Sequence, residues 1–304
     1  MNLTDEIREA ALEAGADDIG FGNIERFENA PPESNPRAIF PDCRTVIAIV
    51  LPQSRASLKT IEEGTYWNTY NFDSYNYLNA AESPRVARPI VLCLERHGYT
   101  AFRLHNSLVP SLKAKRKTRE EHIAPPDAGI SVRQAAVACG LGEMGLNKLL
   151  LTPKFGPRQR IYCILTDARL EPTPLFRGHI CDDCKLCVRA CQAGAFSEER
   201  TAKFTIEDVE YRYGTLDADK CLKVHSGSDP KYSPFITGRE TYEELPPKFY
   251  KDINLQSHDT MGICGARCMR TCLDHLEKTG RIERRFNTAM IDKKRWLPLE
   301  PEAE

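Results

Sequence analysis

The residues of this chain best suited to chemistry are cysteines gathered in one short run. The segment CDDCKLCVRACQ, residues 181–192, spaces four cysteines by three, three and four residues. Thiolates this close together can bind a common metal centre. The chain holds 12 cysteines, and its first residues, MNLTDEIREAALEAGADDIG, carry neither a secretory nor a twin-arginine signal. We therefore expect a cytoplasmic protein whose cysteines are metal ligands or thiols rather than disulfides.

The spacing of this run is the C-x2-C-x2-C-x3-C spacing with which bacterial ferredoxins bind 4Fe-4S clusters. In that motif the fourth cysteine ligates a second cluster, so the run predicts a partner set. Four more cysteines follow in the chain. The crossed arrangement assigns a first cluster to Cys181, Cys184, Cys187 and Cys272. It assigns a second cluster to Cys191, Cys221, Cys264 and Cys268.

Structural zinc is the alternative for paired cysteines. Zinc ribbons use two separated pairs and have no need of a third cysteine after two further residues, so the first run favours iron and sulfide. The second run departs from the motif, since its C-x3-C-x3-C spacing is wider and Gln192 and Leu273 replace the usual prolines after the last cysteine of each set. His225 and His275 lie near the second set and are alternative ligands.

The part of the chain before the cysteine run predicts a separate domain. Segments with helical and strand periodicity alternate to about residue 170, which indicates an α/β or α+β domain whose sheet is covered by helices. We predict helices over 1–20, 83–99 and 131–142, and strands over 45–52, 100–105 and 159–167. The Pro- and Gly-containing segment 171–179 breaks this pattern. We therefore predict domains over 1–170 and 171–280, followed by a charged C-terminal tail, 281–304.

Composition excludes some classes of partner. The 42 basic and 43 acidic residues nearly cancel, so no field over the whole surface attracts nucleic acid or anionic lipid. The longest apolar run, residues 45–51, is far shorter than the roughly 20 residues that cross a bilayer. We expect no membrane partner. A simple electron carrier would not need the first 170 residues, so these residues must serve another purpose.

The segment RQAAVACGLGEMGLNKLLLTPKFGPRQRIYCILTD, residues 133–167, resembles a segment of epoxyqueuosine reductases that reductive dehalogenases share in looser form. LDADKCLK, residues 216–223, resembles the segment between their two cysteine runs. The resemblance implies an α+β architecture in which a nitroreductase-like domain holds base-off cobalamin and a ferredoxin-like domain holds two 4Fe-4S clusters. It implies single-electron transfer through the clusters to the corrinoid.

The same resemblance places cobalamin-binding residues in this chain at Arg133, Gly140, Leu141, Gly142, Gly145 and Asn147. The glycines would permit close approach of a bulky planar ligand, and the alternative is an ordinary helix end and turn. Asn147 could bind corrin amides or could simply occupy a turn. Glu143 and Leu146 stand where the family has tryptophan and lysine.

The proton donor of such a reductase has two candidates here. The family's aspartate aligns with Pro126, one residue before Asp127, so a single slip in register would bring Asp127 into place. Reductive dehalogenases use a tyrosine, for which Tyr75 is our candidate, with Tyr70 and Tyr77 as alternatives and with a phenol pKa lowered by a neighbouring cation. An exposed loop and a packed aromatic helix or lid are the competing interpretations.

Two further groups of residues have simpler interpretations. The basic run KAKRKTR, residues 113–119, could contact phosphate of an RNA or of the corrinoid tail, or could be a solvated helix face. The remaining cysteines, in apolar or helical contexts, are expected to be small buried side chains without a paired histidine, at positions Cys43, Cys93, Cys139 and Cys163.

Three functions follow from these observations. The first is a cobalamin-dependent reductase that removes oxygen or halide from a small molecule, supplied with electrons by a ferredoxin or flavodoxin. The second is a tRNA epoxyqueuosine reductase, which the near-neutral charge and the altered acid segment disfavour. The third is an accessory two-cluster protein that transfers electrons to another corrinoid protein.

Overall fold

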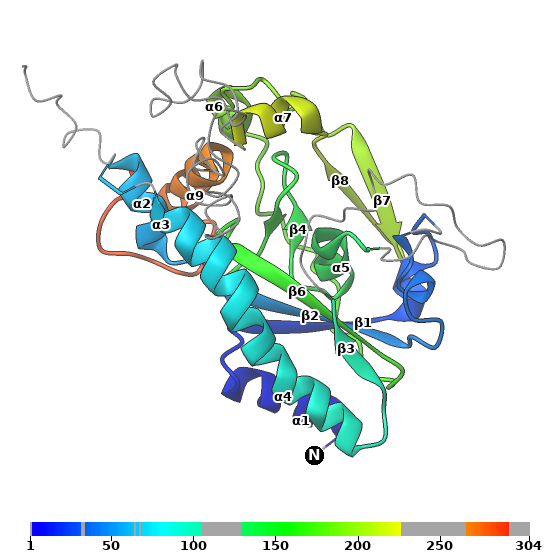
Figure 1. Cartoon of the computed structure of the whole chain (residues 1–304). Coiled ribbons are helices and arrows are strands. Elements are labelled where there is room, and N and C mark those ends of the chain that lie inside the picture. Colours follow the sequence, from blue (N-terminus) through cyan, green and yellow to red (C-terminus); the bar gives the residue numbers. More distant parts are fainter. Residues whose placement is uncertain are drawn as a thin grey trace, which may run out of the picture.

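The computed structural model describes residues 2–31, 34–63, 65–66, 68–104, 129–225 and 266–291 (Figure 1). Its centre is a four-stranded antiparallel sheet of order β1-β2-β6-β3. The strands are β1 (Asp18–Asn23), β2 (Thr45–Pro52), β3 (Ala101–Arg103) and β6 (Gln159–Thr166). Because β2 and β6 are buried over nearly their whole length, they read in the sequence as continuous apolar runs.

Alternation along β2 divides its side chains between two cores. Val46, Ala48 and Val50 belong to the core on one face of the sheet, and Ile47, Ile49 and Leu51 belong to the core on the other. Helices α1 (Leu3–Glu13) and α4 (Ser83–Arg96) cover the second face (Figure 1). Helix α5 (Val132–Ala138) and the hairpin of β7 (Ala202–Ile206) and β8 (Val209–Tyr213) cover the first face.

The sequence predictions for these elements are confirmed with one exception. The predicted strands are present as β2, β3 and β6, and the later two predicted helices are present as α4 and α5. The helix predicted over 1–20 ends at Glu13, because Gly15 takes a left-handed φ of 101° that interrupts it. Residues 18–23 then form β1, paired along its length with β2. The mixed fold with an antiparallel sheet is the predicted α+β class.

The remaining elements connect or flank this sheet. Helix α2 (Arg55–Glu62) is followed by α3 (Asn68–Tyr70) and by a π-helix, η4 (Asn71–Glu82), that runs directly into α4. Strands β4 (Glu143–Met144) and β5 (Leu150–Leu151) form a short hairpin. The cysteine-rich part contributes α6 (Leu186–Ala190), α7 (Ala218–His225) and α9 (Arg267–Thr279). Short 3-10 helices lie at η1 (Ile24–Phe27) and η3 (Pro36–Ala38).

Helix α9 is fixed against the rest of the chain by a third core and by two ion pairs. Leu273 and Leu276 of α9 pack with Leu58 and Ile61 of α2. Arg55 of α2 pairs with Glu277, and Arg270 of α9 pairs with Glu62. Helix α9 also packs against α6. The far end of the described chain is thereby held beside the first cysteine run.

The two segments on either side of residue 170 share hydrophobic packing. Leu175, Ile206 and Tyr211 lie in the same core as Val46 and Val50 of β2. Burial of these side chains against the sheet fixes the cysteine-rich segment relative to it. The division into domains at residue 170 stays a prediction.

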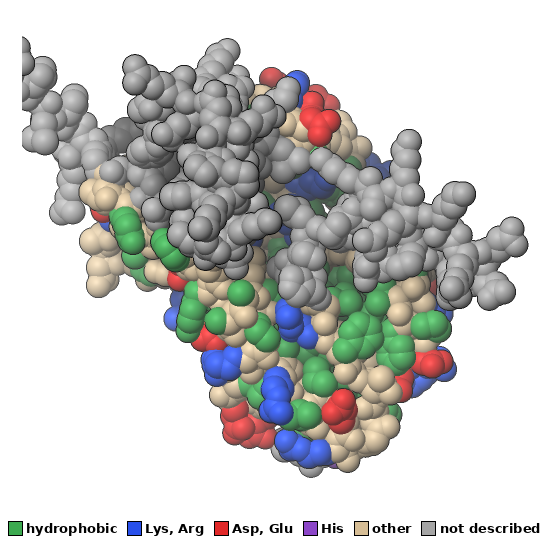
Figure 2. Space-filling model, viewed as in Figure 1, with side chains coloured by type: hydrophobic (Ala, Val, Ile, Leu, Met, Phe, Trp, Pro, Cys, Tyr) green, Lys and Arg blue, Asp and Glu red, His purple; other side chains and the backbone are tan. Residues whose placement is uncertain are grey.

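The surface view agrees with the balanced charge of the sequence. In Figure 2, basic and acidic side chains are interspersed over the face that carries α1 and α4. Among the described residues, no helix has both the length and the apolar character needed to cross a membrane.

Candidate metal centre

The structure brings three cysteines of the first run and one from α9 to a single cavity. Cys181, Cys184 and Cys187 line it from the loop before α6 and from α6 itself, and Cys272 lines it from α9. About 330 Å³ of space free of atoms, part of it open solvent, adjoins the lining residues. These four residues are the ones predicted to hold the first cluster. The other lining residues are Leu146, Asn147, Asp182, Asp183, Lys185, His275 and Leu276.

The loop that carries the first two cysteines has an unusual backbone. Asp183 and Lys185 have φ values of 55° and 58°, in the left-handed region that non-glycine residues seldom adopt. Arg200 stabilises this conformation, because its Nε lies 2.6 Å from Oδ1 of Asp183 and its Nη2 donates to the carbonyl oxygen of Cys181 at 3.0 Å. Backbone strain held by surrounding contacts is common at functional sites.

Glu143 fixes the start of the same loop and was not recognised from the sequence. Its buried carboxylate oxygen Oε1 accepts hydrogen bonds from the backbone nitrogens of Ile180, at 2.8 Å, and Cys181, at 2.7 Å. The sequence marked Glu143 only as a departure from the family's tryptophan. In the structure this side chain orders the backbone at the first cysteine.

We expect Glu143→Leu to destabilise the protein and to impair cofactor retention, because it leaves the two backbone amides without their acceptor. The expected loss is about 1–3 kcal/mol in the free energy of unfolding, measured by anaerobic urea unfolding together with iron content. Glu143→Gln keeps an oxygen acceptor and serves as the matched control. Equal unfolding midpoints for the two variants would show that these hydrogen bonds do not stabilise the loop.

His275, named above as an alternative ligand, lies at this cavity and contacts an acid. Its Nε2 is 2.8 Å from Oδ2 of Asp182, and Nε of Arg281 is 3.2 Å from the same oxygen. Burial opposes ionisation of Asp182, but the hydrogen bond from His275 and the neighbouring guanidinium of Arg281 outweigh it, so the pKa of this carboxyl is lowered. Ligand atoms of Asp182, Cys184 and His275 lie within 4.8 Å of one another, so zinc is a chemical alternative at this end of the cavity.

Burial raises the pKa of the Cys184, Cys187 and Cys272 thiols, so their ionisation is unfavourable without a cation. Burial, followed by the charges of Cys181 and Cys184, raises the pKa of Cys187 to about 12. The pKa of Cys272 is raised by burial and then by the neighbouring cysteines. Four thiolates facing one cavity therefore repel one another, and a positively charged metal centre would relieve that repulsion.

The predicted second cluster is only partly within the described residues. Cys191 ends α6 and its sulfur accepts a hydrogen bond from the backbone nitrogen of Ala195 at 3.4 Å. Cys221 lies on α7 and Cys268 on α9. Cys264 lies outside the described residues. The second cluster therefore stays a prediction.

The direction in which a Cβ would point from each of the predicted corrin-binding glycines is filled by protein atoms. A Cβ on Gly140 would clash with the carbonyl oxygen of Pro174, and one on Gly142 with that of Leu151. Gly140, at φ 78°, also ends α5. The backbone nitrogen of Gly140 donates to the carbonyl of Val137, and the backbone nitrogen of Leu141 donates to the carbonyl of Ala136. A Cβ on Gly145 would lie 2.7 Å from Oδ1 of Asn147. The need for glycine at these positions is explained by a helix end and by close packing within the chain.

We expect Gly142→Ala to lower the free energy of unfolding by about 1–3 kcal/mol, because backbone must move to admit the new methyl group. Gly98→Asn is the control, since Gly98 has a φ of 81° and no atom within 4 Å of a Cβ built on it, and asparagine tolerates this conformation. Thermal unfolding of both variants measures the difference. A Gly142→Ala variant as stable as the control would contradict the packing.

The other predicted cofactor-binding residues lie around the same turn. Nη1 of Arg133 donates to the carbonyl of Lys148 at 3.0 Å, and Leu141 is buried in the core. Oδ1 of Asn147 accepts from the backbone nitrogen of Leu149 at 3.2 Å. Nδ2 of Asn147 is buried and has no hydrogen-bond partner among the described residues. Because Asn147 also lines the cysteine cavity, its amide is placed to serve a sulfur acceptor there.

The candidate proton donors are largely outside the described part of the chain. Asp127 lies outside it, as does the basic run 113–119. Tyr75 is in η4, but its side chain is outside the described residues. Tyr70 is buried, with the guanidinium of Arg160 at 5.9 Å from its ring centre. Tyr77 is exposed and its hydroxyl donates to Glu82, which raises its pKa rather than lowering it as predicted.

The four remaining cysteines are buried, as predicted: Cys43, Cys93, Cys139 and Cys163. Burial raises the pKa of Cys43 to about 11 and that of Cys163 to about 12. The Cys93 thiol is paired with the carboxylate of Glu6 in α1, not with a histidine. His97, the residue that caps α4, contacts the other oxygen of Glu6.

Comparison with known proteins gives relatives in both sequence and fold. A tetrachloroethene reductive dehalogenase of Desulfitobacterium hafniense is 35% identical over 192 residues, which are 59% of this chain and 29% of the relative. One of Sulfurospirillum multivorans is 35% identical over 95 residues, 29% of this chain and 19% of the relative. This chain thus spans less than a third of the curated relatives that it matches. No protein-family model matches it.

Solved structures agree at the level of the fold. An epoxyqueuosine reductase with a modified tRNA-Tyr stem loop superposes with a TM-score of 0.54 at 15% identity, over 92% of this chain and 83% of the other. Epoxyqueuosine reductase from Bacillus subtilis superposes with a TM-score of 0.52 at 15% identity, over 92% of this chain and 83% of the other. A catabolic reductive dehalogenase superposes with a TM-score of 0.50 at 16% identity, over 91% of this chain and 37% of the other. The resemblance to the epoxyqueuosine reductase and reductive dehalogenase superfamily is therefore confirmed, in sequence by the dehalogenases and in fold by both groups.

Proposed function

We propose that this chain is an iron–sulfur reductase that passes single electrons through two 4Fe-4S clusters to a bound corrinoid, and so removes halide or oxygen from a small molecule. The observation that carries the proposal is the convergence of Cys181, Cys184, Cys187 and Cys272 on one cavity. Three of these residues have the spacing of a bacterial ferredoxin, and the fourth comes from a distant helix, as the crossed arrangement requires.

The residues at this cavity fit a 4Fe-4S cluster. Four thiols match the number of ligands that such a cluster takes, and the unpaired buried amide of Asn147 can donate to sulfur. The bound cluster would supply one-electron transfer. The chain's own residues would hold it: Glu143 and Arg200 order the loop of Cys181, and the ion pairs of α9 fix Cys272.

The corrinoid part of the proposal rests on the resemblance to the superfamily. On the side where a Cβ would point, Gly140 and Gly142 face backbone carbonyls, so their packing gives the corrinoid no added support. Cobalamin binding, the proton donors Asp127 and Tyr75, and electron supply by a ferredoxin or flavodoxin are parts of the proposal for experiment to test.

A halogenated or oxygenated small molecule is favoured as substrate by the sequence relatives, which are named as tetrachloroethene reductive dehalogenases at 35% identity. A tRNA epoxyqueuosine substrate is the second candidate, supported by similarity of fold over 83% of two epoxyqueuosine reductases. The near-neutral charge gives no added support to an RNA partner. An accessory role, as electron donor to another corrinoid protein, is the third candidate.

The test is to add cobalamin to the anaerobically isolated protein and follow its absorption. We expect a tightly held base-off form that a low-potential reductant reduces, followed by release of halide from a chlorinated substrate. Retention of clusters without any binding of cobalamin would favour the accessory role. Rescue of queuosine formation in cells that lack the native reductase would instead favour the tRNA substrate, and we expect no rescue.

A further inference from the structure

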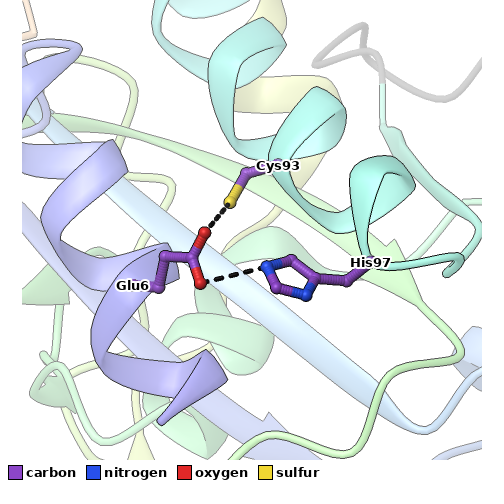
Figure 3. Close-up of side chains that lie close together, drawn as sticks. All are labelled: Glu6, Cys93 and His97. Atoms are coloured by element: carbon purple, nitrogen blue, oxygen red, sulfur yellow. Dashed lines mark hydrogen bonds and ion pairs between the residues drawn. The ribbon is translucent and has the colours of Figure 1, made fainter. Parts of the chain in front are cut away.

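A second group of side chains of metal-ligating types lies between α1 and α4, the helices that cover the second face of the sheet. Glu6 lies between Cys93 and His97 (Figure 3). Oε1 of Glu6 is 3.3 Å from Sγ of Cys93, and Oε2 is 3.0 Å from Nε2 of His97. Ligand atoms of the three residues all lie within 4.8 Å of one another. These residues have no part in the function proposed above.

The backbone positions of the three side chains are set by rigid packing. Cys93 lies in the last turn of α4 and His97, four residues later, is the residue that caps the end of this helix, so the two side chains lie on the same side of it. Ile7 and Ala11 of α1 pack into the same core as Ile90 and Leu94 of α4, which fixes Glu6 opposite them. Because this packing holds the three side chains close together, little conformational freedom would be lost on binding a metal.

The types and separations of the ligands match zinc. Zinc binds thiolate sulfur at about 2.3 Å, imidazole nitrogen at about 2.0–2.1 Å and carboxylate oxygen at about 2.0–2.2 Å. In a tetrahedral site these bond lengths separate neighbouring ligand atoms by roughly 3.4–3.6 Å. The observed separations of 3.3 and 3.0 Å run to the two different oxygens of the Glu6 carboxylate, and all three ligand atoms lie within 4.8 Å of one another, so rotation of these side chains brings them to a common metal ion. Magnesium and calcium prefer oxygen ligands and do not suit this set.

Partial exposure of this group of side chains lets a metal ion enter from solvent and leaves one coordination position for water. The side chains of His97 and Glu6 are 43% and 39% exposed, whereas Cys93 is 5% exposed. A metal can therefore enter from solvent, and water can complete the tetrahedron. A nucleophilic role for Cys93 is disfavoured, because its thiol faces a carboxylate, which opposes formation of the thiolate, and not an imidazole.

We propose that Glu6, Cys93 and His97 form a zinc site that joins α1 to α4. The Cys93 thiol loses its proton to solvent as its sulfur binds the metal, and its hydrogen bond to Glu6 is replaced by the two metal bonds. With three protein ligands and one water, the site stabilises the helix pair that covers one face of the sheet.

Cobalt titration of the cluster-loaded protein, isolated anaerobically and freed of loosely bound metal, tests the proposal. The protein must carry its clusters, because the cysteines of the cluster cavity then cannot bind the added cobalt. We expect one equivalent of Co²⁺ to give a thiolate-to-cobalt charge-transfer band that Zn²⁺ abolishes. Cys93→Ser should lack the band while retaining a hydroxyl donor to Glu6, and Glu6→Gln and His97→Gln should bind at least about tenfold more weakly. Glu9→Gln, an exposed acid on the same helix, is the control and should behave as wild type.

A band of equal strength in wild type and Cys93→Ser would overturn the proposal, as would the absence of any band in wild type. An independent measurement needs no variant. Zinc X-ray absorption of the wild-type protein with one added equivalent should show one sulfur and three lighter ligands. A shell of several sulfurs would place the zinc among the other cysteines and would also overturn the proposal.

Discussion

Cys272→Ser is expected to lose the first cluster and, with it, the reductase activity. Cys272 is the one ligand of the cavity that comes from α9, and the three others lie together near α6. Without it, the cluster has only three thiolates. We expect iron and acid-labile sulfide to fall by at least half relative to the wild-type protein, because one of two clusters is lost. Chemical analysis of the anaerobically isolated variant measures the change.

Cys163→Ala is the matched control for this substitution. Cys163 is fully buried in β6, on the side of the sheet covered by α5, and it has no place in either predicted cluster. Its replacement should cost about 1 kcal/mol of stability and leave the iron content unchanged. If Cys272→Ser kept the full iron and sulfide content, the crossed ligand arrangement would be wrong.

Arg55→Met is expected to lower the free energy of unfolding by about 3–5 kcal/mol, because it leaves the carboxylate of Glu277 buried without its partner. Nη2 of Arg55 lies 2.7 Å from Oε2 of Glu277, and the two side chains are only 8% and 12% exposed. The same nitrogen donates to the carbonyl of Thr288 at 2.7 Å. Since this pair attaches α9 to α2, the variant should also lose iron faster on exposure to a chelator.

Two controls separate the buried charge from a general effect of mutation. The double variant Arg55→Met/Glu277→Leu removes both charges and should recover most of the lost stability. Lys203→Met removes one partner of an exposed pair with Glu210, where the side chains are 62% and 38% exposed, and should change stability by less than about 1 kcal/mol. Anaerobic urea unfolding gives all three values. An Arg55→Met variant that unfolds at the wild-type urea concentration would contradict this account of α9.

The sequence was sufficient to predict the elements whose signal is local. The apolar run 45–52 identified β2, and the spacing of cysteines in 181–192 identified a candidate centre. The assignment of Cys272 to the first three cysteines came from the known crossed arrangement of such clusters, and all four residues line one cavity. Local spacing therefore predicted the first three ligands, and the fourth was predicted from the known ligand arrangement of the motif.

What the sequence did not predict depends on contacts between distant segments. Glu143 binds backbone amides 37 and 38 residues later in the chain, and no periodic pattern marks such a contact. Strand β1 was missed because it starts within the segment that reads as the end of the first helix, so its pairing with β2 decided its structure. The roles of Gly140 and Gly142 depend on carbonyl groups of Pro174 and Leu151, which are apparent only once the chain is folded.

The metal and sulfide content of the anaerobically isolated wild-type protein tests the central claim most directly. If interleaved cysteines enclose two 4Fe-4S clusters, each chain should contain about eight iron atoms and about eight acid-labile sulfides. Zinc bound without sulfide at the cysteine cavity would contradict the claim, and with it the proposed electron transfer.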